Sequence, residues 1–291
     1  MNNKNNTMLQ KELHFVDPKN DVAFRKIFGD ENKKEILISF LNNILEFAGT
    51  DKEIVDISIQ NPYQVPKLKE FKETILDIKA VDKRGIHYII EMQVFYTAAF
   101  DKRVLYYVSK AYHQQLNKGD DYPKLNQVIF LGFLDFPLFQ GNSHYCTRHL
   151  ILEEKSNEHY FQDFELNFVE LPKFNKSLEE LEDIKDKWVY FVKNAKEMKM
   201  IPEELREPKE LREAFEVANQ MSWSKEEMDA YEERGILIQD ERGRIQHALQ
   251  EGKQIGIREE KQAIAKKMLE EGIPPDVIFR VTSLTPEEIQ E

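Results

Sequence analysis

The stretch that decides the fold is residues 74–95, which read TILDIKAVDKRGIHYIIEMQVF. Two runs rich in β-branched and aromatic residues, typical of strands, flank the short polar segment Lys83-Arg84-Gly85. A three-residue loop ending in Gly is a common hairpin connection, because Gly adopts the left-handed conformation of its last position at little cost. The stretch therefore predicts an antiparallel β-hairpin.

The length of the loop also predicts which residues face each other across the hairpin. With three loop residues, antiparallel pairing places Asp77 opposite Glu91, and directly opposed Cβ atoms lie roughly 4.5–5.5 Å apart. Because side chains alternate between the two faces of a strand, Lys79 and Gln93 are expected on the same face as this pair. A loop one residue shorter would put the two carboxylates on opposite faces.

Carboxylates inside apolar strands are costly to bury, and two that converge usually require a cation between them. A divalent metal held by Asp77 and Glu91 would meet this requirement. Mg²⁺ with one or two carboxylate ligands keeps water positions open, which suits hydrolysis of a phosphodiester. Gln93 would be the third group of this face, orienting the water or the phosphate. The other interpretation is a partly exposed strand face that holds no metal.

The segments around the hairpin predict an α/β fold. We expect two helices within 17–48, a strand at 54–59, a helix from Asp101, and strands at 126–136, 144–152 and 159–170. Asp21 and Asn32 are the expected N-caps of the first two helices. The apolar run 126–136 follows a helix, so it is expected as a buried parallel strand. The result is a mixed sheet with helices on both sides.

From Leu178 onward the composition becomes helical and acidic. Helical spacing runs through 178–199, 207–221, 224–233 and 239–271, with breaks expected at Pro202, Pro208 and Gly235. We expect three parts: a core domain at 1–175, a helical extension packing on it at 176–238, and a long helix with a short helical tail at 239–291. The long helix can pair with a second copy, giving a homodimer. The terminal helix pair has the shape of a helix-turn-helix, although its acidity argues against insertion into a major groove.

Composition and charge limit the classes of protein that the chain can be. The single cysteine, Cys146, excludes a disulfide framework and a cysteine-rich metal site. No apolar run is long enough for a membrane span, and the polar first residues lack a signal peptide core, so we expect a cytoplasmic protein without membrane contact. The net charge of −12 arises entirely from residues 147–291, and residues 1–146 are balanced. The N-terminal half can therefore still present a basic face to nucleic acid.

The order α-β-β-β-α-β, with Asp on the second strand and Glu-x-Gln on the third, resembles the PD-(D/E)XK nuclease superfamily. The chain also resembles the Rpn family of recombination-promoting nucleases, which are also described as putative transposases. The matching segments are DPKNDVAFRKIF at 17–28, FLN at 40–42, LDIKA at 76–80, IEMQ at 90–93, Arg103 and Tyr107, YPKLNQVI at 122–129, AIAKKMLEEG at 263–272 and TSLT at 282–285. The resemblance covers most of the chain.

This resemblance implies a restriction-endonuclease-like core and a metal-dependent DNA endonuclease active in recombination or transposition of mobile DNA. It implies Mg²⁺ as the cofactor, with Mn²⁺ or Ca²⁺ as substitutes, and DNA as the partner. Asp77 and Glu91 would bind the metal, and Asp21 would be an auxiliary acid near the first helix. Gln93 stands where the superfamily usually has Lys.

Gln93 lacks the positive charge that a lysine would bring to the water and the phosphate. Lys79 could lend this charge from the same face, although it could also pair with Glu91 or reach solvent. Arg103 could contact phosphate through its fork of donors, or pair with Asp101. The missing lysine also favours a second interpretation, in which a nuclease-fold protein has lost catalysis and binds DNA or a partner protein.

Overall fold

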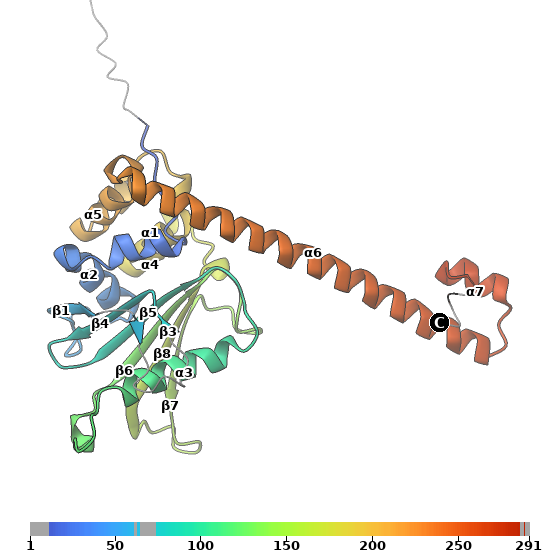
Figure 1. The fold of residues 1–291 in the computed structure, drawn as a ribbon, viewed down its shortest axis with the longest axis horizontal. Coiled ribbons are helices and arrows are strands. Elements are labelled where there is room, and N and C mark those ends of the chain that lie inside the picture. Colours follow the sequence, from blue (N-terminus) through green and yellow to red (C-terminus); the bar gives the residue numbers. More distant parts are fainter. Residues whose placement is uncertain (1–11, 61–62, 65–73, 286–287, 289–291) are drawn as a thin grey trace, which may run out of the picture. The chain divides into compact units, whose positions relative to one another are not determined.

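The computed structural model describes residues 12–60, 63–64, 74–285 and 288. At its centre lies a six-stranded mixed sheet of strand order β1-β4-β5-β6-β8-β7 (Figure 1). Its strands are β1 (Ile57–Gln60), β4 (Ile78–Asp82), β5 (His87–Gln93), β6 (Val128–Leu134), β7 (Cys146–Ile151) and β8 (Phe161–Glu170). A separate two-stranded pair is formed by β2 (Tyr63–Gln64) and β3 (Thr74–Ile75).

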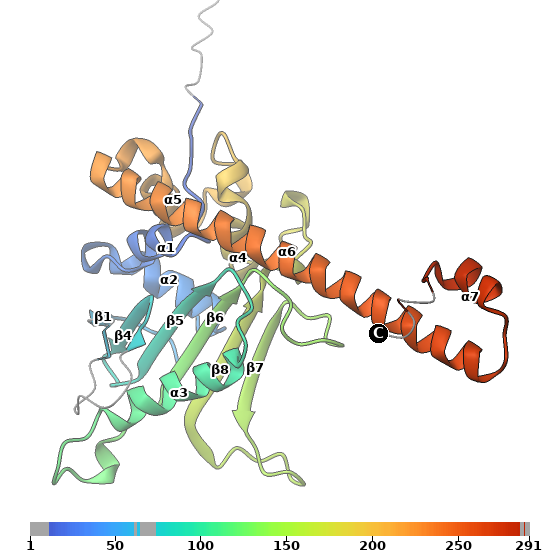
Figure 2. The same ribbon diagram turned by 45° about the vertical axis from the view of Figure 1, so that its right-hand side comes forward.

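Helices cover both faces of the sheet, which confirms the expected restriction-endonuclease-like α/β fold with a helical C-terminal region. The helices are α1 (Asp21–Phe28), α2 (Lys34–Ile44), α3 (Phe100–His113), α4 (Ile184–Asn194), α5 (Lys209–Ala218), α6 (Lys225–Glu270) and α7 (Pro275–Thr282). Four of them, α1, α2, α4 and α5, lie on one face, and α3 lies on the other (Figures 1 and 2).

The β4–β5 hairpin has the predicted register. Ile78 pairs with Ile90 and Lys79 with Ile89, and the same register continued by one residue brings Asp77 opposite Glu91. The loop closes through a hydrogen bond of 3.0 Å from the Gly85 backbone N to the Asp82 carbonyl, with Gly85 at φ +84°. Strand β6 runs parallel to β5, as expected for the apolar run after a crossover helix.

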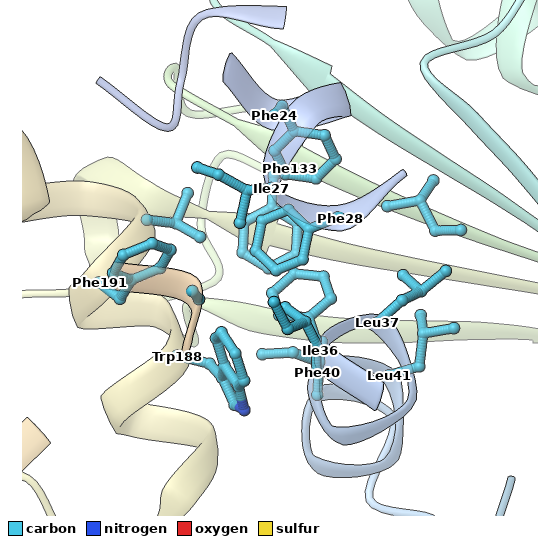
Figure 3. Packing of buried hydrophobic residues seen from close by; sticks show 14 of the residues in the cluster. Phe24, Ile27, Phe28, Ile36, Leu37, Phe40, Leu41, Phe133, Trp188 and Phe191 are labelled. Atoms are coloured by element: carbon cyan, nitrogen blue, oxygen red, sulfur yellow. The ribbon is translucent and has the colours of Figure 1, made fainter. Parts of the chain in front are cut away.

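Two apolar cores hold the sheet between its helices. The larger core contains a group of aromatic side chains from α1, α2, α4 and β6, drawn in Figure 3. Phe40 is central to it, with its ring centroid 4.3 Å from that of Phe28, 5.2 Å from Phe133 and 5.5 Å from Trp188. Such large buried rings contribute much of the burial that stabilises a domain. The smaller core lies under α3 and includes Ile89, Val104 and Phe130.

The structure corrects the two expected helix caps. The N-cap of α1 is Asn20, whose side chain accepts a hydrogen bond from the Val22 backbone N at 3.0 Å. Asp21 is already the first helical residue, so its side chain is free for other partners. Helix α2 has Lys33 at its N-cap, without a side-chain cap hydrogen bond, and Asp30 caps the 3-10 turn that precedes the helix.

Helix α6 continues through Gly235, where the sequence predicted a break. Its 46 residues form one helix, which also contains Gly243, Gly252 and Gly256. Glycine lowers the stability of a helix by about 1 kcal/mol relative to alanine but remains compatible with helical geometry. No proline lies within the helix, so the backbone hydrogen bonds continue.

The chain divides into two compact units, residues 1–235 and 236–291. The second unit has a small core formed by Ala265, Ile278 and Leu284, against which Met268 and Ile273 pack. Gly272, at φ +76°, follows the end of α6 and lets the chain turn toward α7. Within the described residues, no helix combines the length and the apolar character needed to cross a membrane.

Two glycine-to-alanine substitutions should change stability in opposite directions. Gly85→Ala forces a left-handed conformation on a residue with a Cβ and brings that Cβ to 3.0 Å from Asn126, so we expect a loss of about 1–2 kcal/mol. Gly252→Ala meets no described atom within 4 Å and should stabilise α6 by up to about 1 kcal/mol. Urea unfolding, followed by tryptophan fluorescence for the first and circular dichroism for the second, measures both. A Gly85→Ala protein as stable as the wild type would contradict the left-handed conformation of Gly85 in this turn.

Candidate functional site

Asp77 and Glu91 exchange hydrogen bonds at the point where β4 and β5 come together. The Met92 backbone N donates to Asp77 Oδ2 at 2.8 Å, and the Asp77 backbone N donates to Glu91 Oε1 at 3.3 Å. Each carboxylate thus accepts a backbone N–H from the other strand. At this position the Asp77 side chain, rather than a backbone carbonyl, satisfies the Met92 N–H.

The first run of the predicted hairpin, which begins at residue 74, is divided into β3 and β4 at this point. Leu76 belongs to the core under α3, whereas Ile78 belongs to the opposite core, although a regular strand would put both on one face. The alternation therefore shifts at Asp77, which lies in a bend before β4. The Asp77 carboxylate consequently lies beside the Met92 N–H at the strand edge, next to the buried Glu91.

Gln93 joins this pair to helix α3. Its Nε2 donates to Glu91 Oε2 at 2.9 Å, and its Oε1 accepts from Arg103 Nη2 at 2.7 Å. Arg103 Nε is buried and has no hydrogen-bond partner among the described residues. The guanidinium also lies over the Phe100 ring, 5.3 Å from its centroid. Arg103 therefore brings a positive charge, with a donor that has no partner among the described residues, next to the Gln93 amide.

The charge of Asp21 acts on Asp77, but both carboxylate oxygens of Asp21 have other partners. Its Oδ2 accepts from Arg25 Nη2 at 2.8 Å and its Oδ1 accepts from Arg234 Nε at 2.6 Å. The charges of Asp21, Arg25 and Arg234 all act on Asp77. Asp21 is thus a neighbour of the candidate site rather than a part of its hydrogen-bond network.

Lys79 is directed to another part of the same strand pair. It faces Ile89 in the register, and no ion pair or hydrogen bond joins it to Glu91 in the described part of the chain. Burial and the charge of Lys79 lower the pKa of His87 to about 4, so His87 is neutral at pH 7. The positive charge nearest to Gln93 therefore comes from Arg103.

Sequence reasoning named Tyr107 only within the family resemblance, without a role at the site, and it missed Arg234. Tyr107 has its pKa raised by burial and by the charge of Glu91, and its position four residues after Arg103 places both on one face of α3. The spacing of four residues from Arg103 could have indicated from the sequence that Tyr107 lies on the same face of the helix. Arg234 lies far from Asp21 in sequence, within a helix of mixed charge, so no local pattern indicated its contact.

Glu91 is buried and Asp77 is partly buried, and neither has an ion-pair partner among the described residues. Burial raises the pKa of Asp77 to about 6. Burial and the charge of Asp77 raise the pKa of Glu91 well above its usual range. Neither forms an ion pair with any described Lys, Arg or His. The donor set, two adjacent carboxylates, is the chemistry that Mg²⁺ prefers.

The residues fit a metal ion that takes few ligands from the protein. The described residues contain no group of three or more His, Cys, Asp or Glu side chains that could hold a metal ion. Mg²⁺ is usually bound by one or two carboxylates, with its remaining positions taken by water and substrate phosphate. Asp77 and Glu91 match this requirement.

Replacing Glu91 should stabilise the metal-free protein at high pH. Because the native pKa of Glu91 is raised, the native state binds more protons than the unfolded state, and ionisation of Glu91 lowers stability as the pH rises. Glu91→Gln mimics the protonated form. We therefore expect its melting temperature to exceed that of the wild type by a few degrees at pH 8, with the difference shrinking toward pH 5.

The matched control for this experiment is Glu154→Gln at an exposed position, which should leave the melting temperature unchanged. Addition of Mg²⁺ should raise the melting temperature of the wild type and not that of Glu91→Gln, because a ligand stabilises only the state that binds it. A lower melting temperature of Glu91→Gln at pH 8 without metal would show that the ionised carboxylate is already compensated.

Two models of known protein families match the chain. Residues 18–248 match the model of the PD-(D/E)XK nuclease family transposases, and residues 258–291 match that of the C-terminal HTH domain of the Rpn/YhgA-like nuclease family. No curated protein and no solved structure matched the chain. The first match covers most of the chain, including α1 and the whole sheet. The chain therefore belongs to the PD-(D/E)XK nuclease family transposases, of the Rpn type.

Proposed function

We propose that this protein is a Mg²⁺-dependent DNA endonuclease that hydrolyses phosphodiester bonds during recombination or transposition of mobile DNA. The observation that carries the proposal is the adjacent pair Asp77 and Glu91, which are joined by backbone hydrogen bonds and form no ion pair with a described Lys, Arg or His. Metal-dependent phosphodiester hydrolysis needs such a pair of oxygen ligands. Mn²⁺ or Ca²⁺ would bind to the same oxygens. We place this activity in the cytoplasm, in contact with DNA.

Asp77 and Glu91 would hold the metal, because each presents an oxygen fixed by a hydrogen bond from the other strand. When bound, the metal would lower the pKa of a water ligand and neutralise charge on the phosphate. The backbone donors to the two carboxylates would limit their movement. The ligand oxygens would then be oriented before the substrate arrives.

Gln93 and Arg103 would together replace the lysine that is usual in this superfamily. The amide of Gln93 is held with its oxygen toward Arg103 and its nitrogen toward Glu91, so it can orient a water without supplying charge. Arg103 would supply the charge, and its unused Nε can donate to a phosphate oxygen. We give this role to Arg103 rather than to Lys79.

Substitutions at these positions should separate metal binding from turnover. Asp77→Ala and Glu91→Ala should abolish Mg²⁺-dependent nicking of supercoiled plasmid, because each removes a ligand. Arg103→Ala should keep Mg²⁺ binding and lower the nicking rate by about 10²-fold, the effect of losing one donor at a developing charge. Lys102→Ala, on the exposed side of α3, is the matched control. Unchanged nicking in both carboxylate variants would exclude this site.

The alternative is a nuclease-fold protein that has lost catalysis and acts as a DNA- or protein-binding module. The replacement of lysine by Gln93 is the observation that favours it. In that case the wild type would bind Mg²⁺ and DNA without nicking, and Gln93→Lys would restore cleavage by returning the charge. Nicking by the wild type, lost in Glu91→Ala, would exclude the alternative.

We also propose that DNA is contacted by the second unit and that two chains pair through α6. The first proposal is supported by the match to an HTH domain. The second is supported by apolar side chains on one side of α6: the side chains of Ile245 and Leu249 are 41% and 73% exposed, and Gly252 follows at the same helical spacing.

Leu249→Glu should therefore shift the protein toward the monomer in sedimentation analysis, because a charge in the middle of an apolar helix contact is costly to bury. Gln250→Glu, one residue away and off that side of the helix, is the matched control and should leave the mass distribution unchanged. A wild-type protein that is monomeric at all accessible concentrations would contradict the pairing.

A further inference from the structure

One flank of helix α3 carries a strip of cationic and aromatic side chains beside its buried face. The buried face consists of Phe100, Val104, Val108 and Ala111. Next to it, Arg103, Tyr107 and Lys110 follow one another at the i, i+4, i+7 spacing that keeps residues on one side of a helix. Tyr106 is three residues from Arg103 and four from Lys110, so it belongs to the same side. We call these four residues the α3 strip.

The α3 strip begins at the candidate site, as the hydrogen bonds there show. Arg103 Nη2 donates to Gln93 Oε1 at 2.7 Å, and Gln93 Nε2 donates to Glu91 Oε2 at 2.9 Å. The first residue of the strip is therefore two hydrogen bonds away from a carboxylate of the site. A DNA strand with a phosphate at the two acids has the strip as its neighbour on one side.

The aromatic rings of the α3 strip lie beside its cations, and one of them is accessible. The Tyr106 and Tyr107 rings meet edge to face with their centroids 6.5 Å apart, and Lys110 Nζ lies 5.7 Å from the Tyr106 centroid. Tyr107 packs against the core under α3, whereas Tyr106 is 39% exposed. An accessible ring beside cations is the arrangement that binds single-stranded nucleic acid, with bases on the ring and phosphates on the cations.

The charge of α3 also suits a polyanion, although the whole chain carries a net charge of −12. The only acid of the helix is Asp101. Helical spacing places Asp101 on the other flank, together with Leu105 and Tyr112. The Tyr112 hydroxyl donates to Asp163 of β8, so that flank is the one joined to the sheet. The α3 strip itself contains two cations and no acid.

The α3 strip fits unpaired DNA better than a continuous duplex. Inside a duplex both faces of a base are covered by its neighbours, so a tyrosine ring can stack only on a base that is unpaired or extruded. From Arg103 to Lys110 the strip spans about 10 Å of helix axis, at about 1.5 Å per residue. This length corresponds to about three nucleotides at about 3.4 Å each.

We propose that the α3 strip binds single-stranded DNA beside the cleavage site, with one base stacked on Tyr106 and a phosphate held by Lys110, an inference that rests on the proposed function. Unpaired DNA is then the substrate class that the nuclease prefers. Tyr106 determines this specificity and takes no part in the hydrolysis. Duplex DNA held by the second unit does not use the strip.

The first experiment measures DNA binding by the full-length protein in EDTA, where cleavage cannot occur. Fluorescence anisotropy compares a labelled single strand of about 20 nucleotides, longer than one binding site, with the blunt duplex of the same sequence. Tyr106→Ala should weaken single-strand binding about tenfold, the scale of stacking one base on a ring, and duplex binding less than about twofold. Tyr106→Phe keeps the ring and should bind as the wild type. The matched control is Tyr160→Ala, at a tyrosine 66% exposed before β8, which should also bind as the wild type.

The second experiment separates stacking from charge through the salt dependence of single-strand binding. Lys110→Gln should lower the slope of log K against log salt concentration by about 0.7, the effect of one lost phosphate contact on a single strand. Tyr106→Ala should leave this slope unchanged. Lys155→Gln, at an exposed lysine of the loop between β7 and β8, is the matched control and should keep both the slope and the affinity.

Four results would overturn the inference. They are a wild type that does not bind the single strand, unchanged single-strand binding in Tyr106→Ala, an equal loss on the duplex, and an equal loss in Tyr106→Phe. If Tyr106→Ala melts well below the wild type, Tyr106→Leu, which keeps the apolar bulk without the ring, replaces it with the same expectations. Glu91-dependent nicking with single-strand binding that is independent of Tyr106 rejects this inference alone. Tyr106-dependent single-strand binding without any nicking rejects the proposed catalysis and leaves the binding strip in place.

Discussion

The cost of burying two neighbouring carboxylates is the constraint on which the rest of the structure depends. Asp77 and Glu91 lie at the end of apolar strands, where loss of water destabilises the ionised form of both and the charge of Asp77 further destabilises that of Glu91. Backbone donors from Met92 and Asp77 offset part of this cost. The rest of this cost calls for nearby positive charge, and no described Lys, Arg or His forms an ion pair with either acid.

Three arginines act on these two acids, and none of them forms a direct ion pair with either acid. Arg103 acts through Gln93, while Arg25 and Arg234 act through Asp21. Direct pairing would neutralise the carboxylates and remove their need for a cation. Indirect pairing limits the repulsion and leaves the carboxylate oxygens of both acids available, which supports the metal-binding role proposed for them.

The hairpin and the pairing of Asp77 with Glu91 could be predicted from the sequence, because the length of the loop ending in Gly85 sets the register of the two strands. The sequence was also sufficient for the order of the sheet's main elements. It failed where the outcome depends on competition between neighbours. Asn20 and Asp21 are both good caps, and only the backbone conformation decides between them. Gly235 is compatible with either a break or a continuous helix, and Arg234 reaches Asp21 only through the tertiary fold.

The most direct test of the account is calorimetric titration of the metal-free protein with Mg²⁺ at pH 7, repeated in buffers of different ionisation enthalpy. If Glu91 is protonated before the metal arrives, binding must release protons to the buffer, and the apparent enthalpy will change with the buffer. The account predicts binding with proton release in the wild type and the loss of both in Glu91→Gln. Binding of Mg²⁺ that is independent of buffer and unchanged in Glu91→Gln would contradict it.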